Sequence, residues 1–263
     1  MWYRLHKEQR KITEMGFGCM KAIVLAAGKG KRLQSEQFNL PKVLREANGE
    51  PLIGHVLSHI DFIEKNNTVI VVGYMKEKVM EAVGDAYRYS VQEEQKGTGH
   101  AVACAREQFE GYDGDVLILY GDMPLVRRET YQAIIEKHRA SGADCTLLTA
   151  VVDDPPAYGR IVRDADGKVK TIVEDKDCDA EQKKIKELNV GIYVFKAPLL
   201  FEGLKKLKNS NAQGEYYLTD MPMIFIDEGK RVDTYSVDSL TEIYGVNTVE
   251  DLAFCEQELA KQK

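Results

Sequence analysis

The sequence predicts an α/β fold built on a mixed, mainly parallel sheet with helices on both faces. Three largely apolar runs, at residues 22–25, 68–72 and 115–120, have the composition of strands that are buried on both faces. Helical patterns separate these runs, and this alternation is typical of parallel strands joined by helical crossovers. Two further strand patterns around a turn signature predict a small β-rich lobe in the second half.

Local signals place the elements of the first half. Pro51 suits the first turn of a helix, and apolar residues recur at helical spacing through residues 52–63. Thr98 would serve as the N-cap of the alanine-rich helix that follows it. The other elements predicted in this half are a helix at 76–83, a strand at 87–91, a helix at 129–139 and a strand at 143–152.

The second half is less regular. Asp164-Ala165-Asp166-Gly167 is a hairpin signature between strand patterns at residues 158–163 and 169–173. The strongly charged stretch 175–186 predicts a surface loop or helix. The remaining predicted elements are a strand at 188–195, a helix at 198–207, a loop at 209–214, a helix at 215–226, a strand at 232–237 and a helix at 248–261.

Length and composition favour one large domain. A chain of 263 residues, with 44% hydrophobic and 30% charged residues, can bury a substantial core. The sequence contains no internal repeat and no low-complexity linker. Because Met20 immediately precedes the first strand, we divide the chain into an N-terminal extension, residues 1–19, and one domain, residues 20–263, whose last helix spans 248–261.

Charge, hydropathy and cysteine usage argue against several classes of protein. The net charge of −6 disfavours a nucleic-acid partner, which usually needs a basic face. No apolar run approaches the roughly 20 residues that span a bilayer, and residues 1–19 lack the apolar core of a secretory signal. The five cysteines are scattered without a C-x-x-C pair, so we expect reduced thiols in a cytoplasmic protein, with no zinc site and no membrane partner.

The stretch from Lys21 to Arg32 joins the first strand to two glycines and a cationic cluster. The backbone at Gly28 and Gly30 can approach a phosphate closely, and its N–H groups can point at the oxygens. The Walker A spacing is absent, and a dinucleotide fingerprint needs a third glycine where this chain has Leu33. A tight turn of any α/β protein remains an alternative, but the adjoining cations favour a nucleotide-phosphate loop.

Five motifs occur in order along the chain. They are Leu25-Ala26-Ala27-Gly28-Lys29-Gly30-Lys31-Arg32 followed by Pro41-Lys42, then QEEQKGTGHA at 92–101, YGDMPL at 120–125, YGRIV at 158–162 and NAQGEYYLTD at 211–220. Together they resemble the sugar-1-phosphate nucleotidyltransferases, above all the uridylyltransferase domain of the bifunctional bacterial enzyme that makes UDP-N-acetylglucosamine. The resemblance covers residues 20–257. It implies a Rossmann-like fold in which the β-rich lobe binds the sugar.

The resemblance also implies a reaction. N-acetylglucosamine 1-phosphate attacks the α-phosphate of UTP and releases pyrophosphate, which yields a cell-wall precursor. The attacking phosphate oxygen is already ionised, so the reaction needs no general base. Two anions must be brought into line, so catalysis should consist of positioning and charge neutralisation by a divalent cation, here Mg²⁺, and by fixed basic side chains.

The family positions map onto this chain residue by residue. The resemblance implies catalysis by Arg32 and Lys42; metal binding by Asp122 and Asn247; nucleotide binding by Leu25, Ala26, Ala27, Gly28, Gln92, Gly97 and Thr98; and sugar binding by Gly159, Glu174, Asn189, Tyr217 and Thr219. Gln92 has the chemistry for two hydrogen bonds to an imide edge, as uracil reading requires. Asp122 follows a buried strand, where ligands of α/β proteins gather.

Each of these assignments has a plainer alternative. Asp122 could be a turn or N-cap aspartate, and Asn247 a helix N-cap beside Thr248. Lys42 could be a solvated surface lysine, Gln92 a strand-end glutamine, and Glu174 part of a solvated charged face. The family departures Val190 and Cys178, near the expected sugar site, leave the choice of sugar open.

Alternatives remain for the whole protein as well. The same chemistry could serve another sugar 1-phosphate or another pyrimidine triphosphate, and the same fold could serve a catalytically silent sugar-nucleotide sensor. A nicotinamide-dependent oxidoreductase is disfavoured by the missing third glycine. The hexapeptide repeats of the bifunctional relatives are absent, so we expect no acetyltransferase activity and a monomer.

Overall fold

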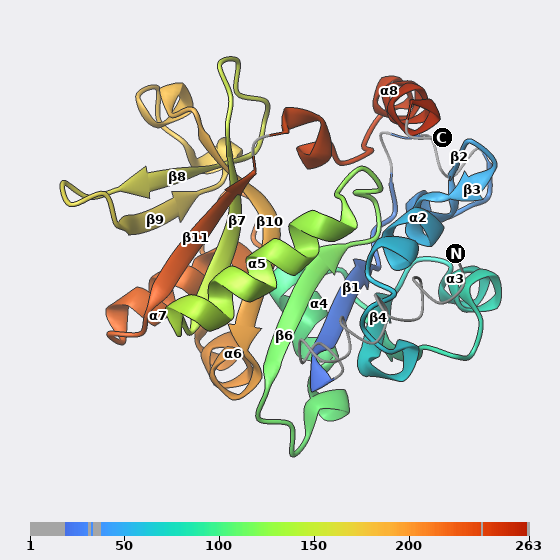
Figure 1. Ribbon diagram of the computed structural model, residues 1–263, viewed down its shortest axis with the longest axis horizontal. Coiled ribbons are helices and arrows are strands. Elements are labelled where there is room, and N and C mark those ends of the chain that lie inside the picture. The colour runs from blue at the N-terminus through green and yellow to red at the C-terminus, as the bar shows by residue number, and fades with distance from the viewer. Residues whose placement is uncertain (1–18, 31–32, 34–37, 238, 262–263) are drawn as a thin grey trace, which may run out of the picture.

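The structure is a computed structural model that describes residues 19–30, 33, 38–237 and 239–261 (Figure 1). The strands are β1 (Lys21–Ala26), β2 (Glu46–Ala47), β3 (Glu50–Pro51), β4 (Thr68–Val72), β5 (Arg88–Val91), β6 (Asp115–Tyr120), β7 (Cys145–Val151), β8 (Gly159–Arg163), β9 (Val169–Val173), β10 (Glu187–Lys196) and β11 (Val232–Val237). The α-helices are α2 (Leu52–His59), α3 (Lys76–Val83), α4 (Thr98–Cys104), α5 (Arg128–Ser141), α6 (Ala197–Gly203), α7 (Met221–Asp227) and α8 (Val249–Ala260).

One mixed sheet organises the described chain. Its strand order is β11-β7-β10-β6-β1-β4-β5, and β8 and β9 branch from β10. Strand β1 pairs in parallel with β4 and β6, whereas β10 runs antiparallel between β6 and β7. The predicted Rossmann-like, mainly parallel sheet with helices on both faces is confirmed.

Side chains of β1 point alternately to the two helical layers. Ala22 and Val24 join the core under α2, α3 and α5, whereas Ile23 and Leu25 join the core under α4, α6 and α7. This alternation explains why the strand carries an unbroken apolar run. Each large aliphatic side chain buried in these layers contributes about 1.5–3 kcal/mol relative to an exposed one.

The β-rich lobe is the hairpin of β8 and β9 beside β10. Asn189 of β10 pairs with Gly159 of β8, so the hairpin is an extension of the main sheet (Figure 1). At the opposite side of the molecule, α8 packs near β2, with Leu252 and Cys255 in a third small core.

Two local predictions are wrong for one common reason. Residues 215–217 are not helical; a 3₁₀ turn, Leu218–Asp220, leads into α7. Their backbone instead bonds to the start of α4 and the residues before it, because Tyr216 N donates to the Lys96 carbonyl and Gly99 N donates to the Tyr216 carbonyl, each at 2.8 Å. Gly97 is the N-cap of α4, and the Thr98 hydroxyl accepts from Leu218 N at 3.0 Å rather than capping its own helix.

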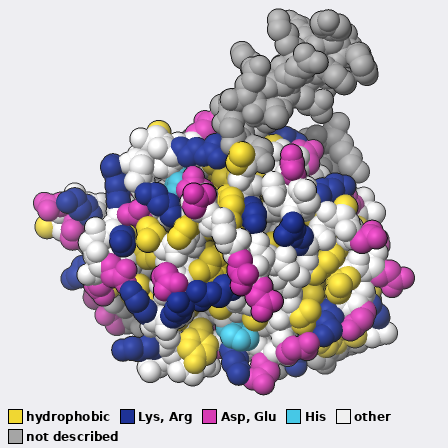
Figure 2. Space-filling view, turned by 90° about the horizontal axis from the view of Figure 1, so that it is seen from below, with side chains coloured by type: hydrophobic (Ala, Val, Ile, Leu, Met, Phe, Trp, Pro, Cys, Tyr) yellow, Lys and Arg dark blue, Asp and Glu magenta, His cyan; other side chains and the backbone are white. Residues whose placement is uncertain are grey.

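On the face that Figure 2 displays, acidic and basic side chains are interspersed. Within the described ranges, no helix is long and apolar enough to cross a membrane. The five cysteines, Cys19, Cys104, Cys145, Cys178 and Cys255, are all unpaired.

Candidate active site

A cavity of about 360 Å³ lies at the carboxyl ends of β1 and β6. This is the edge at which open α/β sheets bind their ligands. The cavity is lined by Leu25, Ala26, Ala27, Gly28, Gly30, Lys42, Val43, Gln92, Gln95, Gly97, Thr98, Ala101, Tyr120, Asp122, Glu215 and Asn247.

Small residues shape the floor of the cavity. Gly121 N donates to the Leu25 carbonyl at 2.9 Å, which draws the chain after β6 against the end of β1. A Cβ at Gly73 would lie only 2.9 Å from the Ala27 Cβ, so the end of β4 can approach β1 only as glycine. The run after Leu25 therefore presents backbone, rather than large side chains, to the cavity.

Lys42, Asp122 and Asn247 meet at one point of the cavity wall. The Lys42 ammonium forms an ion pair with Asp122 Oδ2 and donates to Asn247 Oδ1 at 2.9 Å. The Lys42 side chain is only 11% exposed, so it is not a solvated surface lysine. Pro41 precedes it, and the buried side chains of Val43 and Leu44 anchor the 3₁₀ turn, Lys42–Leu44, that carries it.

The backbone around Asn247 is tied to Asp122. Val246 N donates to the Asp122 carbonyl at 2.9 Å, and Asn247 N donates to Asp251 Oδ2 at 2.8 Å. Thr248, not Asn247, is the N-cap of α8 and forms a capping box with Asp251. Asn247 Nδ2 donates to the Gly245 carbonyl at 3.0 Å, which turns Oδ1 toward Lys42.

These oxygens suit a divalent cation. An aspartate carboxylate and an asparagine carbonyl are ligands that Mg²⁺ accepts, and both already converge on a positive group. No cluster of three or more His, Cys, Asp or Glu side chains that could hold a metal ion occurs among the described residues. The protein therefore offers two oxygen ligands, and phosphate oxygens or water would complete the coordination of a bound metal.

Gln92, Gly97 and Thr98 form another part of the cavity lining. Gln92 is 3% exposed, and its Nε2 donates to the Gly97 carbonyl at 3.0 Å. Gly97 has φ of +108°, and a Cβ there would lie 2.6 Å from the Tyr216 carbonyl oxygen. Only glycine allows both this backbone angle and this approach.

The five expected sugar-binding residues lie in and beside the β-rich lobe, and none of them is among the described residues that line the cavity. Gly159 and Asn189 are direct partners on β8 and β10. Asn189 Nδ2 donates to the Tyr193 hydroxyl at 2.7 Å, and Gln213 Nε2 donates to the Tyr217 hydroxyl at 2.8 Å.

Glu174 follows β9 and sits in a low-dielectric, acidic environment. Burial raises the pKa of its carboxyl, and the neighbouring Asp220 and Asp177 act in the same direction, whereas the Thr219 hydroxyl opposes the rise. The solvated-face alternative for Glu174 therefore does not hold. Tyr120 lines the cavity, and its ring also lies beside Gly191 of β10. Burial and the charge of Glu174 raise the pKa of its hydroxyl.

Most of the expected positions thus gather around one cavity, with the sugar positions beside it. Arg32 lies outside the described residues. Gln95 and Glu215 also line the cavity and were not singled out from the sequence. Both lie inside motifs quoted above, but the second became visible only because residues 215–217 fold back toward Gly97.

Curated proteins with similar sequences point to one kind of relative. Two curated relatives are similar to the chain, each called bifunctional protein GlmU: that of Acetivibrio thermocellus is 45% identical over 89% of this chain, and that of Heliobacterium modesticaldum is 46% identical over 89%. The chain spans about half the length of these relatives, 50% and 51% respectively.

Solved structures show the same fold. One is described as a glucose-1-phosphate thymidylyltransferase from Bacillus anthracis in complex with sucrose, with a TM-score of 0.75, 21% identity, and coverage of 93% of this chain and 96% of that one. Another is a UDP-glucose pyrophosphorylase complexed with UDP-glucose, with a TM-score of 0.71, 17% identity, and coverage of 93% and 99%. The model of the family described as nucleotidyl transferase matches residues 21–239, and the chain therefore belongs to that family.

Proposed function

We propose that the chain is a uridylyltransferase that forms UDP-N-acetylglucosamine and pyrophosphate from UTP and N-acetylglucosamine 1-phosphate. The observation that carries the proposal is the cluster of Lys42, Asp122 and Asn247 at the cavity beside the glycine loop. The likeness to the GlmU proteins supports the choice of nucleotide and sugar.

In the proposed reaction, a phosphate oxygen of the sugar 1-phosphate forms a bond to the α-phosphorus of UTP. The bond from that phosphorus to the oxygen bridging to the β-phosphate breaks, and pyrophosphate leaves with the electron pair. Lys42, whose ammonium already lies in the cavity wall, neutralises the phosphates, and Arg32 is proposed to neutralise the departing pyrophosphate. Positioning and charge therefore supply most of the catalysis.

Asp122 and Asn247 would hold Mg²⁺. When bound, this ion supplies positive charge to the triphosphate, which lowers the cost of bringing a second phosphate close. Gln92, Gly97 and Thr98 would contact the base, the backbone from Leu25 to Gly28 the nucleoside and phosphates, and the lobe residues the sugar. Glu174, Asn189 and Tyr217 offer the carboxylate, amide and hydroxyl groups that hydrogen-bond to a pyranose.

The remaining expectations are part of the same proposal. The catalytic unit would be the domain of residues 20–263, with residues 1–19 as an extension, acting as a cytoplasmic monomer. Its partners would be the two substrates, with no nucleic acid and no membrane. The unpaired cysteines and the interspersed surface charge are compatible with that assignment.

The test is a substrate panel read by pyrophosphate release. We would combine UTP, CTP and dTTP with the 1-phosphates of N-acetylglucosamine, glucose and galactosamine, with and without Mg²⁺. The highest kcat/KM is expected for UTP with N-acetylglucosamine 1-phosphate, and only with the metal. Turnover of another pair, with none of this one, would refute the proposed specificity. Binding of a UDP-sugar without any turnover would favour a silent sensor.

A further inference from the structure

The amide of Gln92 is held by two acceptors at once. Its Nε2 donates to the Gly97 carbonyl and also lies 3.0 Å from His100 Nδ1. The backbone is equally fixed, since Gln92 N donates to the Val72 carbonyl at 2.8 Å. The Gln92 side chain therefore lines the cavity from a fixed backbone position, and its Nε2 atom is already hydrogen-bonded within the protein.

Hydrogen-bond chemistry allows only one orientation of this amide. A backbone carbonyl can only accept, so the NH₂ group must face Gly97. Its second hydrogen then points at His100, and Nδ1 can accept it only when the imidazole is neutral and carries its proton on Nε2. Burial lowers the pKa of His100, and Lys96 lowers it further against the opposing effect of Glu94, so the neutral form prevails at neutral pH.

Both hydrogens of the amide are thus used inside the protein. No hydrogen bond to Gln92 Oε1 occurs in the described part of the chain, although the side chain is almost fully buried. The sequence predicted two hydrogen bonds from Gln92 to a base; the structure leaves only the oxygen for that purpose. A ligand in the cavity must therefore bring a donor.

We propose that His100 is a specificity-determining residue, because together with the Gly97 carbonyl it holds the Gln92 oxygen toward the cavity, where that oxygen selects a base with a ring N–H. The inference rests on the proposed nucleotide site and deepens it. Uracil presents N3–H to such an acceptor, whereas cytosine presents a lone pair at N3 that the oxygen repels. Discrimination then arises from repulsion of the wrong base as well as attraction of the right one.

His100 itself is not among the described residues that line the cavity. It follows Thr98 and Gly99 in the first turn of α4, behind the Gln92 side chain. It therefore acts through Gln92 as a positioning residue. If it is removed, one amide hydrogen loses its acceptor, and the amide can rotate toward an orientation that tolerates cytosine.

The experiment compares UTP with CTP in the full chain, using wild type, His100→Ala and His100→Asn. The asparagine oxygen can accept in place of Nδ1, whereas alanine cannot. We expect His100→Ala to reduce the ratio of kcat/KM for UTP over CTP by about fivefold to tenfold, mainly through KM for UTP. His100→Asn should recover most of the wild-type ratio. Cys104→Ala, on the same helix, is the matched control and should leave the ratio unchanged.

Two outcomes with the variants would overturn the inference. One is an unchanged ratio in His100→Ala; the other is an equal loss in the alanine and asparagine variants together with an equal fall in Tm, which is the behaviour of a merely structural residue. Equilibrium binding of UTP and CTP without a sugar phosphate separates this inference from the proposed function. Turnover of another sugar would refute the proposed sugar and leave the binding preference intact, whereas wild type that binds CTP as tightly as UTP would overturn the inference itself.

Discussion

Strand β6 has an aspartate near each end, and the two carboxylates differ in the partners they have. Asp115, at the start of the strand, and Asp122, just beyond its end, have side chains that are 23% and 21% exposed. Burial therefore does not distinguish them. What differs is whether their partners are fixed parts of the fold or groups that a ligand can displace.

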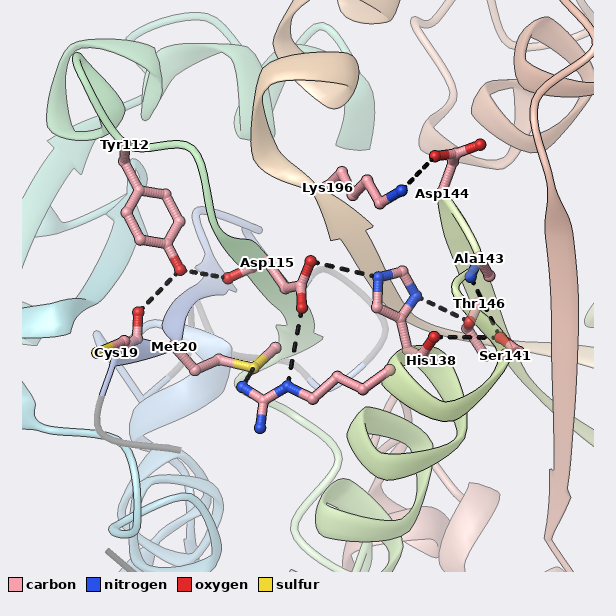
Figure 3. A network of polar contacts seen from close by, with 11 residues as sticks. Cys19, Met20, Tyr112, Asp115, His138, Ser141, Ala143, Asp144, Thr146 and Lys196 are labelled. Atoms are coloured by element: carbon pink, nitrogen blue, oxygen red, sulfur yellow. Dashed lines mark hydrogen bonds and ion pairs between the residues drawn. The ribbon is translucent and has the colours of Figure 1, made fainter. Parts of the chain in front are cut away.

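The partners of Asp115 belong to a closed polar network (Figure 3). Asp115 Oδ1 lies 3.5 Å from His138 Nε2, and Oδ2 lies 3.8 Å from Arg139 Nε. His138 is 2% exposed, and its Nδ1 lies 2.9 Å from the Thr146 hydroxyl. Tyr112 donates to the Asp115 carbonyl at 2.7 Å. The network joins α5, β6 and β7, so these polar groups hold core elements together.

The partner of Asp122 is a lysine that faces the cavity. Lys42 comes from a short 3₁₀ turn rather than a core helix, and both it and Asp122 line the cavity. A bound cation could pair with Asp122 while a bound phosphate pairs with Lys42, so that neither charge is left unpaired when the two side chains separate. We therefore expect the Asp115 network, whose partners are fixed, to govern stability. The Lys42–Asp122 pair, whose partners a ligand can replace, should govern activity, although the two aspartates are almost equally buried.

The largest expected effect is on turnover, at Asp122 just beyond the end of β6. Asp122→Ala should lower kcat by about 10²–10³-fold, because the proposed metal ligand and a charge partner of Lys42 are lost. Its Tm should stay close to that of wild type. Pyrophosphate release and thermal unfolding would measure the two quantities, with Asp115→Ala as the matched control that keeps kcat and loses stability. Full activity in Asp122→Ala would remove this residue from the site.

A smaller effect, on stability alone, is expected at the start of β6, in the network around Asp115. His138→Ala should reduce the free energy of unfolding by about 2–3 kcal/mol, since it opens a buried cavity, removes the partner of the Thr146 hydroxyl and leaves Asp115 with Arg139 alone from this network. Urea unfolding would measure the loss, and kcat should not change. A parallel fall in kcat of the folded variant would show that the two ends of β6 are coupled.

The smallest effect is a difference in pH dependence between the two regions. The pKa of Asp115 is lowered, chiefly by its hydrogen bond with His138, so its contribution to stability is present above its ordinary value of 3.8 and is lost as pH falls. The pKa of Glu174 is raised by burial, so its contribution is present below its ordinary value of 4.5 and is lost as pH rises through the folded-state pKa.

Unfolding measured from pH 3 to pH 8 in two variants would separate these contributions. Asp115→Asn should lose less stability than wild type on acidification. Glu174→Gln should lose less than wild type as pH rises above 4.5. Identical pH profiles for Glu174→Gln and wild type would contradict the burial argument for that carboxyl.

The sequence was most informative where periodicity and topology act together. The apolar runs predicted β4 and β6 with their observed bounds, because central strands of the sheet are buried on both faces and consist mostly of apolar residues. Sequence patterns also placed Asp122 correctly at the end of β6. Single residues such as Lys42 and Asn247 carried no such signal, and only resemblance to a family singled them out before the structure brought them together.

The predicted helix at residues 215–217 is wrong because of tertiary contacts. The local pattern of Glu215 and two tyrosines suits a helix start, but hydrogen bonds to Lys96 and Gly99 compete with helix formation there. Threonine is likewise a favoured N-cap residue, yet the Thr98 hydroxyl accepts a hydrogen bond from Leu218 N instead. Neither contact can be inferred from neighbouring residues, because the partners lie far apart in the sequence; Thr98 and Leu218, for example, are 120 positions apart.

The contact between Lys42 and Asn247 joins positions 205 residues apart. Such a separation costs little at equilibrium, because each doubling of loop length adds only about 0.6 kcal/mol of closure entropy. Its consequence concerns time during synthesis. The glycine loop and β6 can form while the chain is still emerging from the ribosome, but Asn247 is translated only after every strand of the main sheet. A nascent chain therefore lacks the asparagine oxygen of the proposed metal site until the strands of its core have been made.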